Sequence, residues 1–252
     1  MTICYFTATG NCLYVAKRIG GELRSIPNML KNSTMDISDD AVGIICPVYA
    51  GQMPGMVRSF IEKARIKTDY LFFVYTYGMS ESVARPTAIS VTENAGLKLD
   101  YVNAVLMVDN YLPGFEVQKQ IDTAAKKDIE GQIEQVCRDI ADRKHNAGKV
   151  TMLHRIGMAA VHGTMGKAIH RSDAAKKYIV NDSCVKCGIC AKVCPADNIT
   201  VTDKVIFSDH CEVCYACVHN CPKNAIHLKS ERSAVRFRNE HVALKEIISA
   251  NE

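Results

Sequence analysis

Eight of the twelve cysteines fall into two runs of the same spacing, and this feature constrains the chain more than any other. The first run, CVKCGICAKVCP, begins at Cys184, and the second, CEVCYACVHNCP, begins at Cys211. Each run has the form C-x2-C-x2-C-x3-C-P, and the second follows the first with an offset of 27 residues. A repeat that also duplicates the spacing of metal-binding residues indicates two equivalent structural units.

This spacing is typical of bacterial proteins that hold two 4Fe-4S clusters. Three thiolates at x2 spacing wrap one face of a cubane, and the fourth cysteine of the run lies too far round to reach the same cluster. Each run therefore lends its last cysteine to the other run. One cluster is expected on Cys184, Cys187, Cys190 and Cys221, and the other on Cys211, Cys214, Cys217 and Cys194.

Two zinc sites are the alternative, because zinc ribbons with four cysteines also use C-x2-C hooks. A ribbon needs only two hooks and has no use for the third and fourth cysteine of each run, so the spacing favours iron. Residues 179–230 resemble the bacterial two-cluster ferredoxins. One departure is Tyr215, which stands where the first run has Gly188. This tyrosine can alter access to its cluster and leaves the ligands intact.

The first 146 residues alternate short apolar runs with amphipathic stretches, which predicts a parallel sheet covered by helices on both faces. Strands are expected near residues 2–6, 42–47, 70–76 and 101–108, with a fifth strand near 23–27. Apolar residues at helical spacing predict one helix over 13–23 and a longer one over 117–140, which should cover the sheet and close the domain.

A loop suited to a phosphate follows the first expected strand. The residues TATGNC, Thr7 to Cys12, precede an amphipathic helix and offer hydroxyls, backbone N–H groups and the positive end of the helix dipole. The chain lacks the Gly-x4-Gly-Lys-Ser/Thr pattern of ATP and GTP sites and the G-x-G-x-x-G pattern of dinucleotide sites. A short loop without lysine or arginine suits one terminal phosphate, such as that of FMN, although an ordinary strand-to-helix turn has a similar composition.

Three more loops follow the expected strands: PVYAGQMP, TYGMS and DNYLPG. In a doubly wound sheet of order 2-1-3-4-5, these loops gather at the carboxyl ends of the strands, where the ligand crevice opens. The arrangement resembles the flavodoxin family across residues 1–146. The expected fold is therefore α/β, with a flavodoxin-like sheet and a smaller C-terminal α+β ferredoxin domain.

The flavodoxin resemblance implies a set of FMN-binding residues. For the phosphate they are Thr7, Thr9, Gly10, Asn11 and Cys12. Cys12 replaces the hydroxyl residue usual there, which removes one hydrogen-bond donor. For the isoalloxazine ring they are Tyr49, Ala50, Gly51, Gln52, Thr76, Tyr77, Gly78, Asn110 and Tyr111. Tyr77 or Tyr111 can stack on the ring, although tyrosines near strand ends are also common as half-buried core residues.

A chain of 252 residues can hold one full core and a smaller module. Residues 147–178 carry six Lys and Arg against one Asp, which predicts a helical basic connector that could receive an acidic redox partner. A solvated helical face is the plainer interpretation of the same charges. The tail, residues 231–252, allows a closing helix through Val242, Leu244, Ile247 and Ile248, and no function is attached to it.

Composition excludes several classes. A net charge of +4 is too mild to indicate nucleic-acid binding. The longest uncharged run, residues 41–57, is interrupted by Pro47, Gly51 and Pro54, so a membrane span is not expected. The first residues enter a strand and a loop without a basic and apolar leader, which predicts a cytoplasmic protein. Because the cytoplasm is reducing, this prediction favours cysteines that bind metal over cysteines that form disulfides.

Together the two parts resemble fused flavodoxin/ferredoxin proteins of anaerobes, and this resemblance implies an electron-transfer protein with FMN and two clusters. A flavin exchanges one or two electrons and each cluster exchanges one, so the fusion can couple the two kinds of carrier. One alternative is an FMN-dependent reductase of a small organic substrate, although no acid/base pair stands out beside the flavin loops. Another is a first domain that has lost FMN and only docks a partner. The redox partner, any substrate and the oligomeric state stay open.

Overall fold

The apolar runs of the first half form a five-stranded parallel sheet in the computed structural model, which describes residues 1–166 and 174–252. From one edge to the other the strands are β2 (Glu22–Ser25), β1 (Thr2–Tyr5), β4 (Ala41–Pro47), β6 (Tyr70–Tyr77) and β7 (Tyr101–Leu106). Numbered along the chain within this sheet, the order is 2-1-3-4-5. The predicted fold class is confirmed. The central strands β4 and β6 are buried along most of their length, as strands covered on both faces must be.

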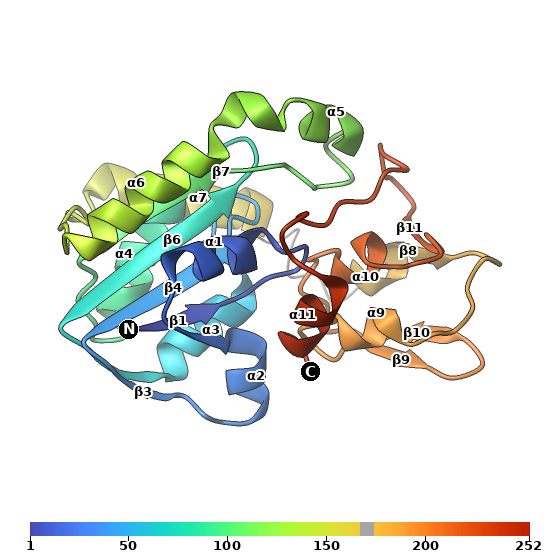
Figure 1. Ribbon diagram of the computed structural model, residues 1–252, viewed down its shortest axis with the longest axis horizontal. Coiled ribbons are helices and arrows are strands. Elements are labelled where there is room, and N and C mark those ends of the chain that lie inside the picture. The colour runs from blue at the N-terminus through green and yellow to red at the C-terminus, as the bar shows by residue number, and fades with distance from the viewer. Residues whose placement is uncertain (167–173) are drawn as a thin grey trace.

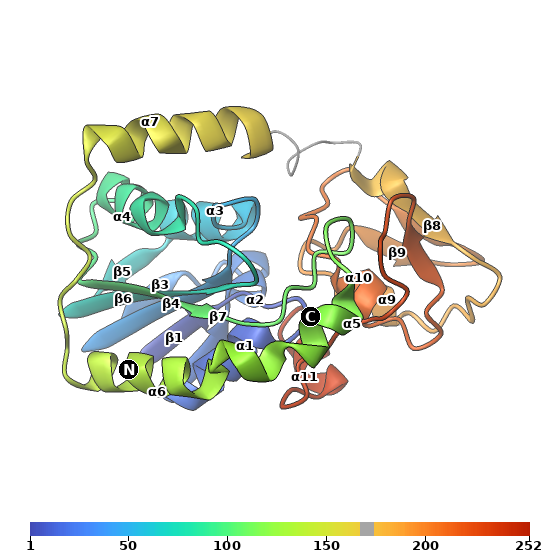
Figure 2. The same ribbon diagram turned by 90° about the horizontal axis from the view of Figure 1, so that it is seen from above.

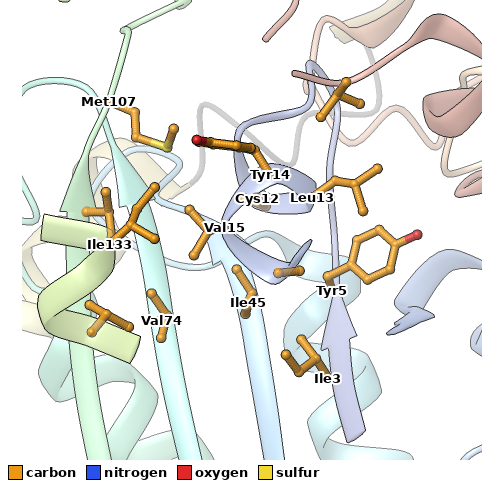
Figure 3. Close-up of a cluster of buried hydrophobic side chains, with 14 of the residues drawn as sticks. Ile3, Tyr5, Cys12, Leu13, Tyr14, Val15, Ile45, Val74, Met107 and Ile133 are labelled. Carbon is orange, nitrogen blue, oxygen red and sulfur yellow. The ribbon is translucent and has the colours of Figure 1, made fainter. Parts of the chain in front are cut away.

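Helices cover both faces of the sheet (Figure 2). On one face lie α1 (Asn11–Ile19) and α6 (Ile129–Ala141), and on the other α2 (Ile26–Lys31), α3 (Gly55–Lys63) and α4 (Ala84–Asn94). On the α1 face, Val15 and Ile133 pack over Ile3, Ile45 and Val74 of the strands (Figure 3). This packing holds α1 in place, and with it the loop that precedes it.

The long helix predicted over 117–140 is wrong, because the chain breaks there into α5 (Val117–Asp122), a 3-10 turn η1 (Ala124–Lys127) and α6. Asp128 between the last two has φ 45°, in the left-handed region. The reason is tertiary: Lys127 turns inward, and its Nζ donates to the carbonyl oxygens of Met107 at 2.6 Å and Gly78 at 3.3 Å. Carbonyls at strand ends need donors, and that need overrides the helical period.

Two smaller details also differ from the sequence expectation. The first helix ends at Ile19 rather than near residue 23, because Gly20 and Gly21 adopt positive φ and β2 begins at Glu22. A short parallel pair, β3 (Asp36–Ser38) with β5 (Arg65–Lys67), lies beside the main sheet. Three-residue strands carry too little periodicity to be recognised from sequence.

The second half forms a small module with two antiparallel strand pairs (Figure 1). Its pairs are β8 (Tyr178–Val180) with β11 (Ile226–Leu228), and β9 (Ile199–Val201) with β10 (Val205–Phe207). The short helices are α9 (Ile189–Lys192) and α10 (Ala216–His219). It lies beside the carboxyl ends of the parallel strands (Figure 2).

Between the two parts, the expected connector forms α7 (Met152–Val161), the π-helical turn η2 (His162–Gly166) and the 3-10 turn η3 (Ala174–Lys177). Residues 167–173 of that connector lie outside the described residues. Met152, Leu153 and Ile156 of α7 are 60–76% exposed. Within residues 1–166 and 174–252, none of the helices has both the length and the apolar character needed to cross a membrane.

The C-terminal segment returns to the first domain and ends in α11 (Leu244–Ser249). Val242, Ile247 and Ala250 belong to the same apolar cluster as Ile3 and Leu13. Polar contacts reinforce this packing: Lys17 pairs with Glu246 at 2.9 Å, and Asn28 Nδ2 donates to the Ser249 carbonyl at 3.0 Å. The tail therefore passes between the sheet domain and the small module (Figure 1).

Four cysteines lie outside the two runs. Cys4, Cys12 and Cys46 are buried in the first domain, and Cys137 is partly buried on α6. Burial raises the pKa of Cys4 and of Cys12 to about 12, so both are neutral thiols at physiological pH. Cys4 and Cys46 behave as small packing residues in the sheet.

Replacing Gly43 with alanine tests the packing of the central strands. A Cβ at Gly43 would overlap the ring of Phe72, which is fully buried. We expect Gly43→Ala to lower the free energy of unfolding by about 1–3 kcal/mol, because the ring must leave its position in a close-packed core. Denaturant unfolding measures this change. Gly163→Ala is the control, since a Cβ there meets nothing within 4 Å, and a loss as large as that of Gly43→Ala would contradict the explanation.

Candidate functional site

The eight cysteines of the two runs line two separate cavities in the small module. One cavity is lined by Cys184, Cys187 and Cys190 of the first run together with Cys221 of the second, and it encloses about 320 Å³ of empty space, part of it open to solvent. The other is lined by Cys211, Cys214 and Cys217 together with Cys194, and encloses about 310 Å³. We call these the first and second cysteine sets. In the structure, each cavity is thus lined by the first three cysteines of one run and the last cysteine of the other run.

The backbone repeats with the sequence. Three pairs of residues 27 positions apart share the left-handed conformation, and none of the second members is glycine: Lys186 and Val213, Gly188 and Tyr215, Asp197 and Asn224. Positive φ is unfavourable for β-branched and bulky residues, so these turns are imposed by the path of the loop. Each run is thereby curled around its cavity in the same way.

Backbone N–H groups point at several of the sulfur atoms. Cys194 Sγ accepts from Asn198 N–H at 3.3 Å, and Cys221 Sγ accepts from Ala225 N–H at 3.2 Å, four residues on in both cases. Cys211 Sγ accepts from Val213 N–H at 3.3 Å. Donors of this kind favour the thiolate form and, in iron–sulfur proteins, influence the reduction potential.

Among the residues that the structure describes, no three His, Cys, Asp or Glu side chains converge closely enough to hold one metal ion. The four thiols of each set surround a space instead of meeting at a point. The first set reaches the surface, where Cys187 is exposed and the neighbouring Val185 is 58% exposed. Cys194 and Cys217 of the second set are buried.

The predicted phosphate loop lies between β1 and α1 and is largely buried, with Thr7 and Thr9 at 2% and 4% exposure. Gly10 is the N-terminal cap of α1 at φ 101°, and its N–H donates to Thr7 Oγ1 at 3.2 Å. The remaining N–H groups of the loop and of the first helical turn find no acceptor among the described residues; they belong to Thr7, Ala8, Thr9, Asn11, Cys12 and Leu13. Buried donors of this kind require an acceptor, and a phosphate at a helix N-terminus supplies one. The loop therefore fits the phosphate of FMN.

The loop after β4 forms a tight turn. Tyr49 and Gln52 exchange backbone hydrogen bonds of 2.8 and 3.0 Å across Ala50 and Gly51, both of which have positive φ. This is the geometry of a type I′ turn, which needs positive φ at both central positions. Gln52 Nε2 is buried without an acceptor among the described residues, so the side chain has a free donor for the polar edge of a ring.

Most of the other predicted residues lie around the phosphate loop. Cys12 Sγ lies 3.1 Å from Thr76 Oγ1, Asn110 Nδ2 donates to Thr9 Oγ1 at 2.6 Å, and Gly78 packs against Asp109. Tyr111 follows Asn110 and is 49% exposed. Tyr77 differs from these: it lines an open cavity beside α4 together with Arg85, Asn146 and His154.

Residues of the small module and the tail cover these loops, and the sequence pattern does not indicate them. Asn220 Nδ2 donates to the Ala8 carbonyl at 3.1 Å, Asn239 N–H donates to the Thr9 carbonyl at 2.8 Å, and His219 Nε2 lies 2.9 Å from the Asn110 carbonyl. Because His219 Nδ1 accepts from Phe237 N–H at 3.1 Å, its Nε2 must carry the proton. Burial lowers the pKa of His219 to about 4, which keeps the ring neutral. Nothing in the local sequence marks these residues, since their partners are more than 100 positions away.

Comparison with protein families gives two matches. Residues 2–106 match the flavodoxin domain, and residues 177–200, which contain the first cysteine run, match the 4Fe-4S binding domain. The second run lies outside the matched range. No curated protein sequence matches this chain.

Several solved structures are similar to part of the chain. A flavoprotein from Lactobacillus acidophilus in complex with FMN shares 12% identity, with 49% of this chain and 97% of that chain covered and a TM-score of 0.31. Rubredoxin oxygen:oxidoreductase from Desulfovibrio gigas shares 9%, with 56% and 36% covered and a TM-score of 0.34. A flavodoxin from the domain Archaea shares 12%, with 54% and 97% covered and a TM-score of 0.29.

Paired cysteine variants test the exchanged ligand sets. In the exchanged arrangement, Cys184→Ser with Cys221→Ser damages only the first set, so about four of about eight iron atoms should remain. Cys184→Ser with Cys194→Ser damages one member of each set and should leave less iron. Iron and acid-labile sulfide are measured after anaerobic purification. The reverse ranking of the two double variants would show that each run binds its own cluster.

Proposed function

We propose a route for electrons in this chain. The chain is a fusion of a flavodoxin domain with a 4Fe-4S ferredoxin module. The two domain types support a flavin and iron–sulfur electron-transfer role. The proposal is that the chain binds one FMN and two 4Fe-4S clusters and passes electrons from the first cysteine set, through the second set, to the flavin loops. The reverse direction uses the same route.

The observation that carries the proposal is the position of Cys214. This cysteine of the second set packs against both apolar clusters of the flavodoxin domain, one on each face of its sheet. Its neighbour Glu212 accepts from Met56 N–H at 3.4 Å, so the same loop also touches the start of α3. The second set therefore lies against the carboxyl edge of the sheet, where the flavin loops are.

The residues of the edge have separate tasks. The unpaired N–H groups between Thr7 and Leu13 would hold the phosphate, and Gln52 Nε2 would donate to the ring. A bound FMN would supply two-electron chemistry and each bound 4Fe-4S cluster one-electron chemistry, so two clusters together would match one flavin. The N–H groups beside Cys194, Cys211 and Cys221 would adjust the cluster potentials.

The first cysteine set offers the point of exchange with a redox partner. Cys187 and Val185 are exposed, and Lys186 and Lys223 also line the cavity of this set. An exposed thiolate ligand shortens the distance over which an electron must pass to another protein, and the lysines favour an acidic partner. In the second set none of the four cysteines is exposed: Cys194 and Cys217 are buried, and Cys211 and Cys214 are partly buried.

A second candidate is an FMN-dependent reductase of a small substrate. One observation favours it: the open cavity beside Tyr77, which is also lined by Arg85, Lys149 and His154, adjoins one of the flavin loops. Against it, the small module and the tail bond to the Ala8, Thr9 and Asn110 carbonyls and so cover the edge from the other side. That cover favours electron transfer between bound cofactors over turnover of a free substrate.

Anaerobic purification followed by quantification of iron, sulfide and flavin tests the cofactor content. The proposal expects about eight iron atoms and one FMN per chain, from two cysteine sets and one phosphate loop. Bound zinc without iron would contradict it. Iron without flavin would leave a ferredoxin module with a docking domain.

A glycine pair tests the phosphate loop within the same purification. Gly10 has φ 101°, and a Cβ there would lie 3.0 Å from the Cβ atoms of Asn239 and Val242. Gly10→Ala should therefore lose most of its FMN and keep its iron. Gly96→Ala is the matched control, because Gly96 has φ 74° with nothing within 4 Å of its Cβ; it adds similar backbone strain away from the site. Equal flavin content in the two variants would rule out the loop as the FMN site.

A further inference from the structure

Tyr215 occupies a position where the repeat calls for glycine. Its counterpart in the first run, 27 residues earlier, is Gly188, and the two residues have φ 57° and 78°. A tyrosine in the left-handed region carries a strain that glycine would not. The path of the loop imposes this conformation, and the strain persists only where the surroundings hold it.

The contacts of the ring show what it does there. The centroid of the Tyr215 ring lies 5.9 Å from the ring centroid of Tyr111, which belongs to the flavin loop after β7. It lies 6.5 Å from the ring centroid of Tyr178. The hydroxyl of Tyr178 lies 3.5 Å from Cys211 Sγ, and its ring stacks on that of Phe207 with the two centroids 4.9 Å apart. The row Tyr111, Tyr215 and Tyr178 therefore runs from the flavodoxin domain to the second cysteine set. These separations are typical of favourable aromatic pairs.

The repeat supplies an internal comparison. At the first cysteine set, which faces solvent, the same backbone position is Gly188, and a Cβ there would meet nothing within 4 Å. At the second set, which faces the flavodoxin domain, the position carries the ring that reaches Tyr111. The ring is thus present at the copy of this position that lies beside Tyr111, and it is absent at the copy whose Cβ would meet nothing within 4 Å.

We infer that Tyr215 is a positioning residue that couples the second cysteine set to the flavin loop, by holding the loop of Cys214 and Cys217 against Tyr111. This inference rests on the proposed electron route. The ring acts through its contact with Tyr111 and fixes the separation of the two redox sites. With both cofactors bound, an external reductant would be oxidised, and its electrons would pass one at a time from a cluster on the second set to the flavin, which would be reduced.

The test compares the full-length wild type with Tyr215→Gly and Tyr215→Asn, both of which accept the left-handed conformation, and with the control Tyr215→Phe, which keeps the ring. Each protein is purified anaerobically, its iron and flavin are quantified, and it is then mixed rapidly with dithionite. Cluster bleaching and flavin bleaching are followed separately, because the external reductant reaches the exposed first set whatever residue 215 is.

We expect Tyr215→Gly and Tyr215→Asn to keep iron and flavin and to reduce their clusters at the wild-type rate. Flavin reduction should be slower by about two- to tenfold, the change in docking that loss of one aromatic pair gives. Tyr215→Phe should match the wild type. A protein that is only less stable would change both rates or lose cofactor, so the split between the two rates separates positioning from stability.

Unchanged flavin reduction in both small variants, with cofactors intact, would overturn the role of Tyr215 and leave the electron route standing. A wild type that binds FMN and clusters but never passes electrons between them would overturn the route itself. A Tyr215→Phe variant as slow as Tyr215→Gly would assign the effect to the hydroxyl and so overturn the role of ring packing.

Discussion

The docking of the small module on the sheet domain depends on hydrogen bonds to three backbone carbonyls at one edge of the sheet. The loops that follow strands of a parallel sheet carry carbonyl groups that lie outside the ladder. Here the loop carbonyls of Ala8, Thr9 and Asn110 accept from Asn220, Asn239 and His219, in that order. The same loops leave N–H groups unpaired at the start of α1. The loops at this edge dock the small module through their carbonyl groups, and in the proposed function their N–H groups would bind the phosphate of FMN. The same loops could then serve both partners, because one uses the acceptors and the other the donors of the backbone.

The tail explains why this docking is firm. Residues that follow the second cysteine run continue to Asn239, which bonds to the phosphate loop, and then to Ile247 in the core beside Ile3 and Leu13. Asn239 Nδ2 also donates to Asn11 Oδ1 at 3.1 Å. The module is therefore held from two directions, by α10 and by the tail, so its orientation does not rely on the connector. Apolar burial in the tail supplies non-directional stability, while the asparagine contacts fix the register.

The parts that could be predicted from the sequence are those with a short-range signature. The runs around Ile44 and Phe73 are long enough to indicate buried strands, and the strand-end loops indicate the edge where a ligand binds. The spacing from Cys184 to Cys194 predicts that each run lends its last cysteine to the other. The structure groups the thiols in this way, and the binding of iron by them stays a prediction. The break at Asp128 and the contact of Asn239 with Thr9 have no such signature. The break depends on the carbonyl groups that Lys127 reaches, and the contact depends on a loop 230 positions earlier in the chain. The spacing of apolar residues carries no information about partners so distant.

The coupling between metal and domain docking follows from the same contacts. Each cavity is walled by four thiols and by apolar residues such as Ile199 and Phe207 at the second set or Val201 and Ile226 at the first. Thiolates brought together without metal repel one another, so the loops that curl around them would gain stability from clusters bound there. The second loop is also the surface that carries Cys214 onto the sheet domain and Tyr215 onto Tyr111. In the proposed function, assembly of a cluster on the second cysteine set would therefore complete the cover of this edge, and the bound cluster would hold the loop that keeps Tyr215 in the left-handed conformation.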